Sequence, residues 1–229
     1  MRTIFTLILA ASLSYAVAQV KEISVSPFSE ITITGPFNTT LVRSTTCKVE
    51  INYNGLDSKD VIIRSHGGEL EVKIEHGLFD FDNYGDRNKK RATVTIYYTS
   101  VNDIDLKQGA TLRATETLTA DRMKLKSRMG SEMKLDLKVQ DLILDSSMGS
   151  EVDLSGTAIN FELSAKMGSD VDASQLKCQD VMVSASMGAS VRVYAERELD
   201  ASANFGATVT CKGNPKRKKT SGTFGADFN

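Results

Sequence analysis

The sequence lacks most of the features that would assign it to a common functional class. It has no tryptophan, three prolines, three cysteines and two histidines among 229 residues, and its net charge is −1. A charge so close to zero gives no sign of nucleic-acid binding. An odd, small number of cysteines without an evident pairing pattern argues against a disulfide-stabilised scaffold. We found no catalytic motif, and we therefore expect a protein that is not an enzyme.

Helical hydrophobic periodicity is also absent, and apolar residues instead alternate with polar ones, as in half-buried strands. The pattern is clearest in residues 102–229, where a glycine is followed by Ser or Ala, a polar residue and an apolar residue. The glycines that begin these seven copies lie 21, 19, 19, 20, 18 and 19 residues apart: Gly109, Gly130, Gly149, Gly168, Gly188, Gly206 and Gly225. A fixed period near 20 residues is typical of a solenoid.

The residues around each glycine fall into columns when the copies are aligned. Leu125, Leu144 and Leu163 share one inward column, and an inward slot two residues later holds only Ser or Ala. We predict three short strands and three corners per coil, with corresponding side chains stacked at ~4.8 Å per coil. The fold class expected is all-β, a parallel β-helix solenoid that we expect to be right-handed, with an irregular β N-terminal part.

The residue before each of the last six glycines is large and apolar. These residues are Met129, Met148, Met167, Met187, Phe205 and Phe224. We interpret them as an interior ladder. A Cu(I) site is the alternative, because thioethers suit that ion, but phenylalanine in the same slot argues against it.

Residues 1–18 have the composition of a signal peptide. Arg2 supplies a positive charge, an apolar run follows, and Ala16-Val17-Ala18 is a cleavage signal with Gln19 as the new N-terminus. No second apolar run is long enough to span a membrane, so we expect export without a transmembrane segment. We expect residues 19–229 to form a single domain, in which 19–101 are an irregular β opening that caps one end and 102–229 are regular repeats.

The last coil is expected to cap the other end of the solenoid. Lys218, Thr220 and Gly222 occupy its strand slots in place of large apolar residues. The basic run 215–219 either belongs to this cap or contacts an anionic surface. We expect Cys178 and Cys211 to be buried free thiols, and the sequence does not place Cys47.

The export signal, the Ile-x-Ile-x-Gly-x-Phe stretch at 31–37 and the repeated Gly-Ser/Ala phrase together resemble a bacterial family. It is the family of the putative auto-transporter adhesin, head GIN domain, and the resemblance covers roughly residues 28–227. It implies an exported parallel β-helix and a role in adhesion, and it brings no catalytic residues. Where many members have Ser before the glycine, this chain has Met or Phe.

Four carboxylates form the sharpest candidate site. Two positions on one strand and the same two positions one coil on make a grid of Glu151, Asp153, Asp170 and Asp172. Stacked like charges need compensation, which Lys134 and Arg192 could supply from neighbouring coils. A Ca²⁺ ion is the alternative compensation, and it is the only cofactor that we consider. A third alternative is a glycosidase-like pair of carboxyls, which rests on analogy of fold.

A second candidate site is the long excursion 77–88 between two strands. Its aromatic and acidic residues could bind a ligand such as a glycan: Phe79, Asp80, Phe81, Asp82 and Tyr84. The alternative is a hairpin packed on the N-terminal end of the solenoid.

Taken together, these observations favour an exported, non-enzymatic binding protein of the cell envelope, an adhesin that recognises glycan or protein. Its location would be the periplasm, the outer-membrane surface or the medium. Two other functions stay open: a structural module that self-assembles into homo-oligomers, and a carbohydrate-active enzyme that uses the acidic grid.

Overall fold

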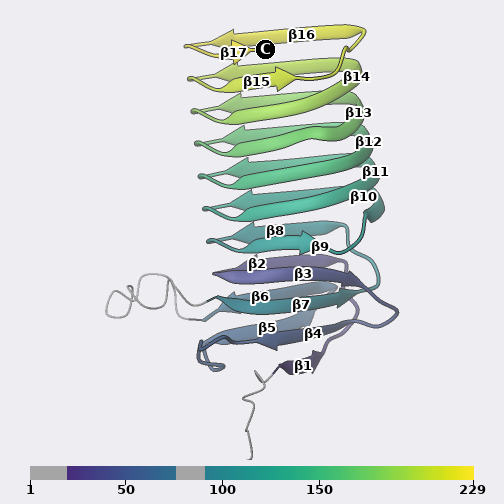
Figure 1. Ribbon diagram of the computed structural model, residues 1–229, viewed down its shortest axis with the longest axis vertical. Coiled ribbons are helices and arrows are strands. Elements are labelled where there is room, and N and C mark those ends of the chain that lie inside the picture. Colours follow the sequence, from purple (N-terminus) through teal and green to yellow (C-terminus); the bar gives the residue numbers. More distant parts are fainter. Residues whose placement is uncertain (1–19, 76–90) are drawn as a thin grey trace, which may run out of the picture.

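The computed structural model describes residues 20–75 and 91–229. All the regular elements in these residues are β-strands, joined in one 17-stranded sheet that winds into a column (Figure 1). The column is a parallel β-solenoid of about 7 turns with coils ~19 residues apart, which confirms the predicted fold class. None of the described residues belongs to a helix long and apolar enough to cross a membrane.

Nine strands form the first coils and their cap. They are β1 (Lys21–Ser24), β2 (Glu30–Thr34), β3 (Phe37–Arg43), β4 (Lys48–Asn52), β5 (Val61–His66), β6 (Glu69–Ile74), β7 (Ala92–Tyr98), β8 (Asp103–Lys107) and β9 (Thr111–Ala114). The later coils contain β10 (Leu118–Arg128), β11 (Glu132–Ser147), β12 (Glu151–Lys166), β13 (Asp170–Ser186), β14 (Ser190–Asn204), β15 (Thr208–Cys211), β16 (Arg217–Thr223) and β17 (Asp227–Phe228).

Each regular coil is built from one long strand that bends, where we had predicted three short strands. β11, β12 and β13 each run without interruption from one glycine turn to the next. In β11 the alternation of buried and exposed residues changes phase once, at the exposed pair Gln140 and Asp141. The strand therefore continues through the bend, although the pairing with the next coil skips Val139 and Gln140, and only the glycine turn ends the strand.

The interior of the coils is filled by the predicted aliphatic columns. Leu125, Leu144 and Leu163 are each at most 1% exposed and lie directly over one another. The narrow slot holds Ser127 and Ser146 in the early coils and alanine in the later ones. These buried serines are satisfied by hydrogen bonds within the core, which is the usual condition for burying a hydroxyl group.

The glycine turns form one edge of the solenoid, where the arrowheads of β10 to β14 end in Figure 1. The residue before each glycine and the glycine itself both have positive φ, for example 58° at Met129 and 69° at Gly130. Two such residues in succession are the mark of a type I′ turn, and the Ser169 N–H donates to the Lys166 carbonyl (3.4 Å) as that turn requires. Each turn also bonds to the next, as Gly130 N–H does to the Met148 carbonyl (3.0 Å).

The prediction that the residues before the glycines form an interior ladder is wrong. They are stacked as expected, but they point into solvent, with exposed fractions of 44% at Met129, 46% at Met167 and 76% at Phe224. The left-handed backbone of the turn is the reason, because it interrupts the in–out alternation of the strand. Burial resumes one residue after the glycine, where Ser131, Ser150 and Ser169 are each 1% exposed.

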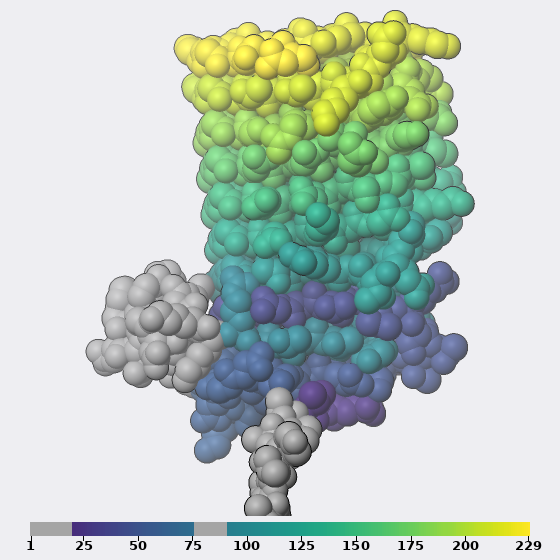
Figure 2. Space-filling view, in the orientation of Figure 1, coloured from purple at the N-terminus to yellow at the C-terminus, as the bar shows by residue number. Residues whose placement is uncertain are grey.

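The N-terminal part follows an order along the axis that differs from its order in sequence. β2 pairs in parallel with both β8 and β6, and β3 pairs in parallel with both β9 and β7. The coil of β2 and β3 is therefore inserted between the coils of β6–β7 and β8–β9. In Figure 2 the N-terminal colours are accordingly interleaved at the base of an otherwise evenly graded column. β1, β4 and β5 add antiparallel pairings at this end, which confirms an irregular opening.

The C-terminal coil is polar, as predicted. Lys218 lies over Leu199, Thr220 over Ala201 and Gly222 over Ala203. The basic run is partly neutralised from the coil beneath, because Lys219 contacts Asp200 (3.1 Å) and Arg217 contacts Glu198.

The three cysteines lie in the described residues and none is bonded to another. Cys178 is 1% exposed, as expected for a buried thiol. Burial and the charge of Glu196 raise the pKa of its thiol to about 12. Cys211 is only half-buried, contrary to our expectation, because few side chains of the last coil cover it. Cys47, which the sequence did not place, is half-buried with its Sγ 3.8 Å from Thr99 Oγ1.

Candidate functional site

The four carboxylates of the grid lie where the repeat placed them. Glu151 pairs with Asp170 and Asp153 with Asp172 across β12 and β13. Arg192 compensates two of the charges, because its guanidinium contacts Asp170 at 2.8 Å and Asp172 at 2.9 Å. The several N–H donors of a guanidinium can contact two carboxylates at once, which a lysine ammonium group does less well.

The remaining compensation is weaker. Lys134 lies 3.5 Å from Asp153, and both side chains are about half exposed or more. Glu151 has no ion-pair partner among the described residues. Cations from the coils on both sides therefore contact three of the four carboxylates, and within the described chain only Glu151 is open.

The most perturbed carboxyl of the grid is Asp172. Burial opposes its ionisation, but hydrogen bonds from Ser174 and Arg192 outweigh burial and lower its pKa to about 2. The main-chain N–H of Ser174 donates at 3.0 Å. A glycosidase general acid requires the opposite shift, a raised pKa, so Asp172 is unsuited to that role.

The calcium alternative stays a prediction. Within residues 20–75 and 91–229 no group of three or more His, Cys, Asp or Glu side chains is arranged to hold a metal ion. Asp170 and Asp172 already accept hydrogen bonds from Arg192, so a cation would have to displace the guanidinium or use Glu151 and Asp153 alone.

Two other predicted features lie outside the described residues. These are the signal peptide 1–18 and the candidate binding loop with Phe79, Asp80, Phe81, Asp82 and Tyr84. Both stay predictions.

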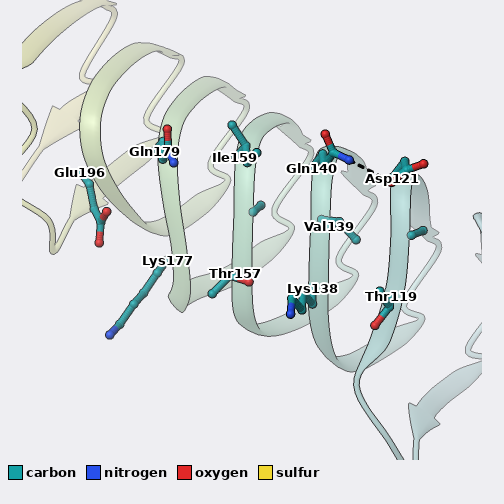
Figure 3. Close-up of a pocket in the computed structure, with 12 residues that line it drawn as sticks. Thr119, Asp121, Lys138, Val139, Gln140, Thr157, Ile159, Lys177, Gln179 and Glu196 are labelled. Atoms are coloured by element: carbon teal, nitrogen blue, oxygen red, sulfur yellow. Dashed lines mark hydrogen bonds between the residues drawn. The ribbon is translucent and has the colours of Figure 1, made fainter.

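A groove runs along the solenoid axis on the outer wall of the regular coils. It crosses coils from β10 to β14, beside their bends, with a volume of about 710 Å³ (Figure 3). One rim is a column of Thr119, Lys138, Thr157 and Lys177, which pair from coil to coil. The other rim is a column of Asp121, Gln140, Ile159 and Gln179.

The rims of the groove are polar except at Ile159, and its floor is apolar. Ala120, Val139 and Ala158 form the floor between the two columns. Gln140 donates to Asp121 (2.9 Å), the hydrogen bond drawn in Figure 3. Lys138 and Lys177 make no ion pair with any described residue, and they stand two coils apart, ~9.6 Å at the usual strand spacing. The groove therefore offers regularly spaced donors and acceptors, of which only the Gln140–Asp121 pair is joined by a hydrogen bond across the described rims.

A second groove, of about 590 Å³, lies beside the acidic grid. Its lining includes Lys134, Asp153, Asp172, Ser174 and Lys212, whose Nζ donates to Ser174 Oγ (3.1 Å). Two carboxylates of the grid, Asp153 and Asp172, thus line this groove.

The sequence did not predict the first groove, nor that the column of residues before the glycines is exposed at the edge of the solenoid. The bend that forms the groove is marked by two adjacent polar residues, as at Gln140 and Asp141, and this break in alternation was a usable signal. The edge column could have been found from the turn chemistry, since a residue before glycine between two strands takes the left-handed conformation of a type I′ turn.

Comparison with solved structures places the fold. The chain is similar to a structure described as a putative adhesin from Bacteroides fragilis, with TM-score 0.79, 20% identity, and 92% of this chain and 95% of the other covered. It is similar to a structure described as a putative adhesin from Parabacteroides merdae, with TM-score 0.68, 15% identity, and 92% of this chain and 95% of the other covered. It is also similar to a structure described as a putative lipid binding protein from Parabacteroides distasonis, with TM-score 0.67, 16% identity, and 92% of this chain and 96% of the other covered.

Comparison at the level of sequence gives the family. No curated protein matches the chain. A family model matches residues 27–215, which include every coil from β2 to the end of β15. The chain belongs to the family of the putative auto-transporter adhesin, head GIN domain.

Proposed function

We propose that the chain is an exported, non-enzymatic binding protein of the cell envelope, and that the groove beside the bends of β10 to β14 recognises an extended glycan. The observation that carries the proposal is the pair of rims of this groove. One rim carries a hydroxyl or an ammonium group in each coil, in alternation, and the other carries an amide in every second coil. A rigid parallel wall holds these groups at a fixed spacing.

The chemistry of the rim favours a glycan over a folded protein partner. Thr119, Thr157, Gln140 and Gln179 are neutral hydrogen-bonding groups that suit a ligand with repeating hydroxyls. The groove is too shallow for a compact protein element and has no deep apolar pocket for an anchor residue. Lys138 and Lys177 additionally favour a glycan that carries acidic groups.

The family supports a binding role, because it and two of the similar structures are described as putative adhesins. The signal peptide expected at residues 1–18 supports export. The lipid-binding description of the Parabacteroides distasonis structure would imply a different ligand, and the free lysines could also contact a lipid headgroup.

Binding of the mature chain to an array of envelope and host glycans tests the proposal. We expect hits among extended acidic glycans, and we expect Lys138→Ala with Lys177→Ala to weaken binding at least tenfold. Lys124→Ala is the matched control, because Lys124 lies on the other wall of the coil and outside the groove.

An array without hits would overturn the proposal, as would equal binding by the double variant and the control. Binding only to vesicles that carry anionic lipid, lost in the double variant, would replace the glycan by a membrane surface.

A further inference from the structure

The exposed column at the glycine turns is an apolar surface feature that neither the core nor the groove explains. We call it the edge ridge and define it as Met129, Met148, Met167, Met187, Phe205 and Phe224, one residue from each of six successive coils. Coil spacing makes it ~24 Å long. The rings of Phe205 and Phe224 are stacked, with centroids 5.2 Å apart.

The edge ridge is unfavourable for an isolated chain in two respects. Each residue holds positive φ, between 52° and 58°, and for a non-glycine residue this costs roughly 1 kcal/mol or more. Asparagine would fit the same backbone with less strain. Each residue also leaves between 44% and 76% of its surface in water. A continuous apolar patch of this kind marks a contact surface.

The polar columns that flank the edge ridge show what could cover it. On the side before the turn lie Arg128 and Lys166, with Ser, Asn or Thr in the other coils. On the side after the turn lie Glu132, Glu151, Asp170 and Asp227. Glu132 and Asp170 are paired with Arg113 and Arg192 in the same chain. Among the described residues that flank the edge ridge, the unpaired charges are therefore Glu151, Asp227 and Lys166, and this balance gives no attraction to an anionic lipid surface. One side carries the cations and the other side carries the anions.

We propose that the edge ridge is a homodimer interface, in which two copies meet edge to edge with parallel axes and with corresponding coils opposite each other. A two-fold axis parallel to the solenoid brings the side before the turn of one copy beside the side after the turn of the other. Arg128 then faces Glu132 of the second copy, and Lys166, which has no ion-pair partner among the described residues, faces Asp170 of the second copy. Arg128 also contacts Asp105 in its own chain, and Glu132 and Asp170 contact Arg113 and Arg192, so the new contacts add to existing ion pairs. An antiparallel arrangement instead brings like sides together and sets Glu132 near Asp227 of the second copy.

The composition of the edge ridge fits this contact. Methionine and phenylalanine are enriched in the cores of protein interfaces, and methionine adapts its shape to a partner. Identical coil spacing in the two copies allows all six levels to meet at once. The contact is narrow, so we expect a dissociation constant on the order of micromolar.

Sedimentation of the mature chain over a concentration series tests the interface. We expect concentration-dependent dimers, and we expect Met148→Asn with Met167→Asn to raise the dissociation constant at least tenfold. Asparagine tolerates the turn backbone, so the variant should fold, which circular dichroism and the melting temperature check. Met182→Asn is the matched control, because Met182 is 57% exposed and lies outside the edge ridge.

Cross-linking distinguishes the two orientations. Met129→Cys and Phe224→Cys should each form a covalent dimer with itself on addition of a short bismaleimide, and a mixture of the two should give few mixed dimers. Wild type treated in the same way controls for Cys47, Cys178 and Cys211. Predominantly mixed dimers would show the antiparallel arrangement and overturn the proposed one.

Three other results would overturn the interface itself. These are a monomer at every concentration, a dimer that the asparagine variant retains, and a monomer whose edge ridge instead binds neutral phosphatidylcholine vesicles. The glycan proposal is unaffected by any of them, because the groove and the edge ridge share no residue.

Discussion

Two apolar columns of this solenoid have the same period, but one is buried and the other is exposed. Leu125, Leu144 and Leu163 are at most 1% exposed, whereas Met129, Met148 and Met167, four residues further on in the same coils, are at least 44% exposed. The difference is backbone conformation, since only the second column has positive φ. A repeat in the sequence therefore shows which residues stack, and the turn chemistry decides on which side of the wall they stand.

The same substitution in both columns gives the largest contrast. Leu163→Asn should lower the free energy of unfolding by about 4 kcal/mol or more, because it removes buried apolar surface and buries an amide. Urea unfolding followed by circular dichroism measures the change. A loss below ~1 kcal/mol would mean that Leu163 is not part of a packed interior.

Two glycines sharpen the comparison between wall and edge. A Cβ at Gly156, in the wall, would lie 2.0 Å from the Leu137 carbonyl oxygen, whereas one at Gly149, in a turn, would meet nothing within 4 Å. We expect Gly156→Ala to cost about 2–5 kcal/mol and Gly149→Ala about 1 kcal/mol, the strain of the left-handed backbone alone. Equal melting temperatures of the two variants would contradict this account.

The predictable parts of the fold follow from local rules. Alternation and the 19-residue repeat gave the columns, the pairing of Asp153 with Asp172, and the polar slots at Lys218 and Thr220. The insertion of β2 and β3 beneath β8 and β9 was not predictable, because it depends on pairings between residues more than 70 positions apart that share no repeat. The groove depends on a bend that alternation marks only as a pair of polar residues.

Substitution of the buried serines Ser146 and Ser150 tests the hydrogen bonds of the interior beside the glycine turns. Ser150 Oγ accepts from the Ser147 N–H (3.0 Å), donates to the Ser127 carbonyl (2.8 Å) and lies 2.9 Å from Ser146 Oγ. Ser150→Ala should cost about 1–2 kcal/mol, because it leaves these buried groups without a partner. Adding Ser146→Ala should cost little more, since it removes one of those groups. Fully additive losses, measured by urea unfolding, would contradict this coupling.

The outer wall should respond to pH through Asp172. Its pKa is lowered from 3.8 to about 2 in the folded chain, so its ionised form stabilises the fold above a pH of about 4. That contribution should fade as the pH falls from about 4 to 2. Asp172→Asn should therefore be less stable than wild type near neutral pH, and the difference should shrink over this interval. A constant difference would show that the carboxyl's charge is not responsible.

The free energy of unfolding of Met167→Asn, measured at concentrations where the chain is monomeric, tests most directly whether the residues before the glycines stand outside. We predict a change of less than about 1 kcal/mol, because relief of backbone strain offsets the contacts that the methionine loses to its neighbours. A loss of about 3 kcal/mol or more would place Met167 in the interior and contradict the account of the edge.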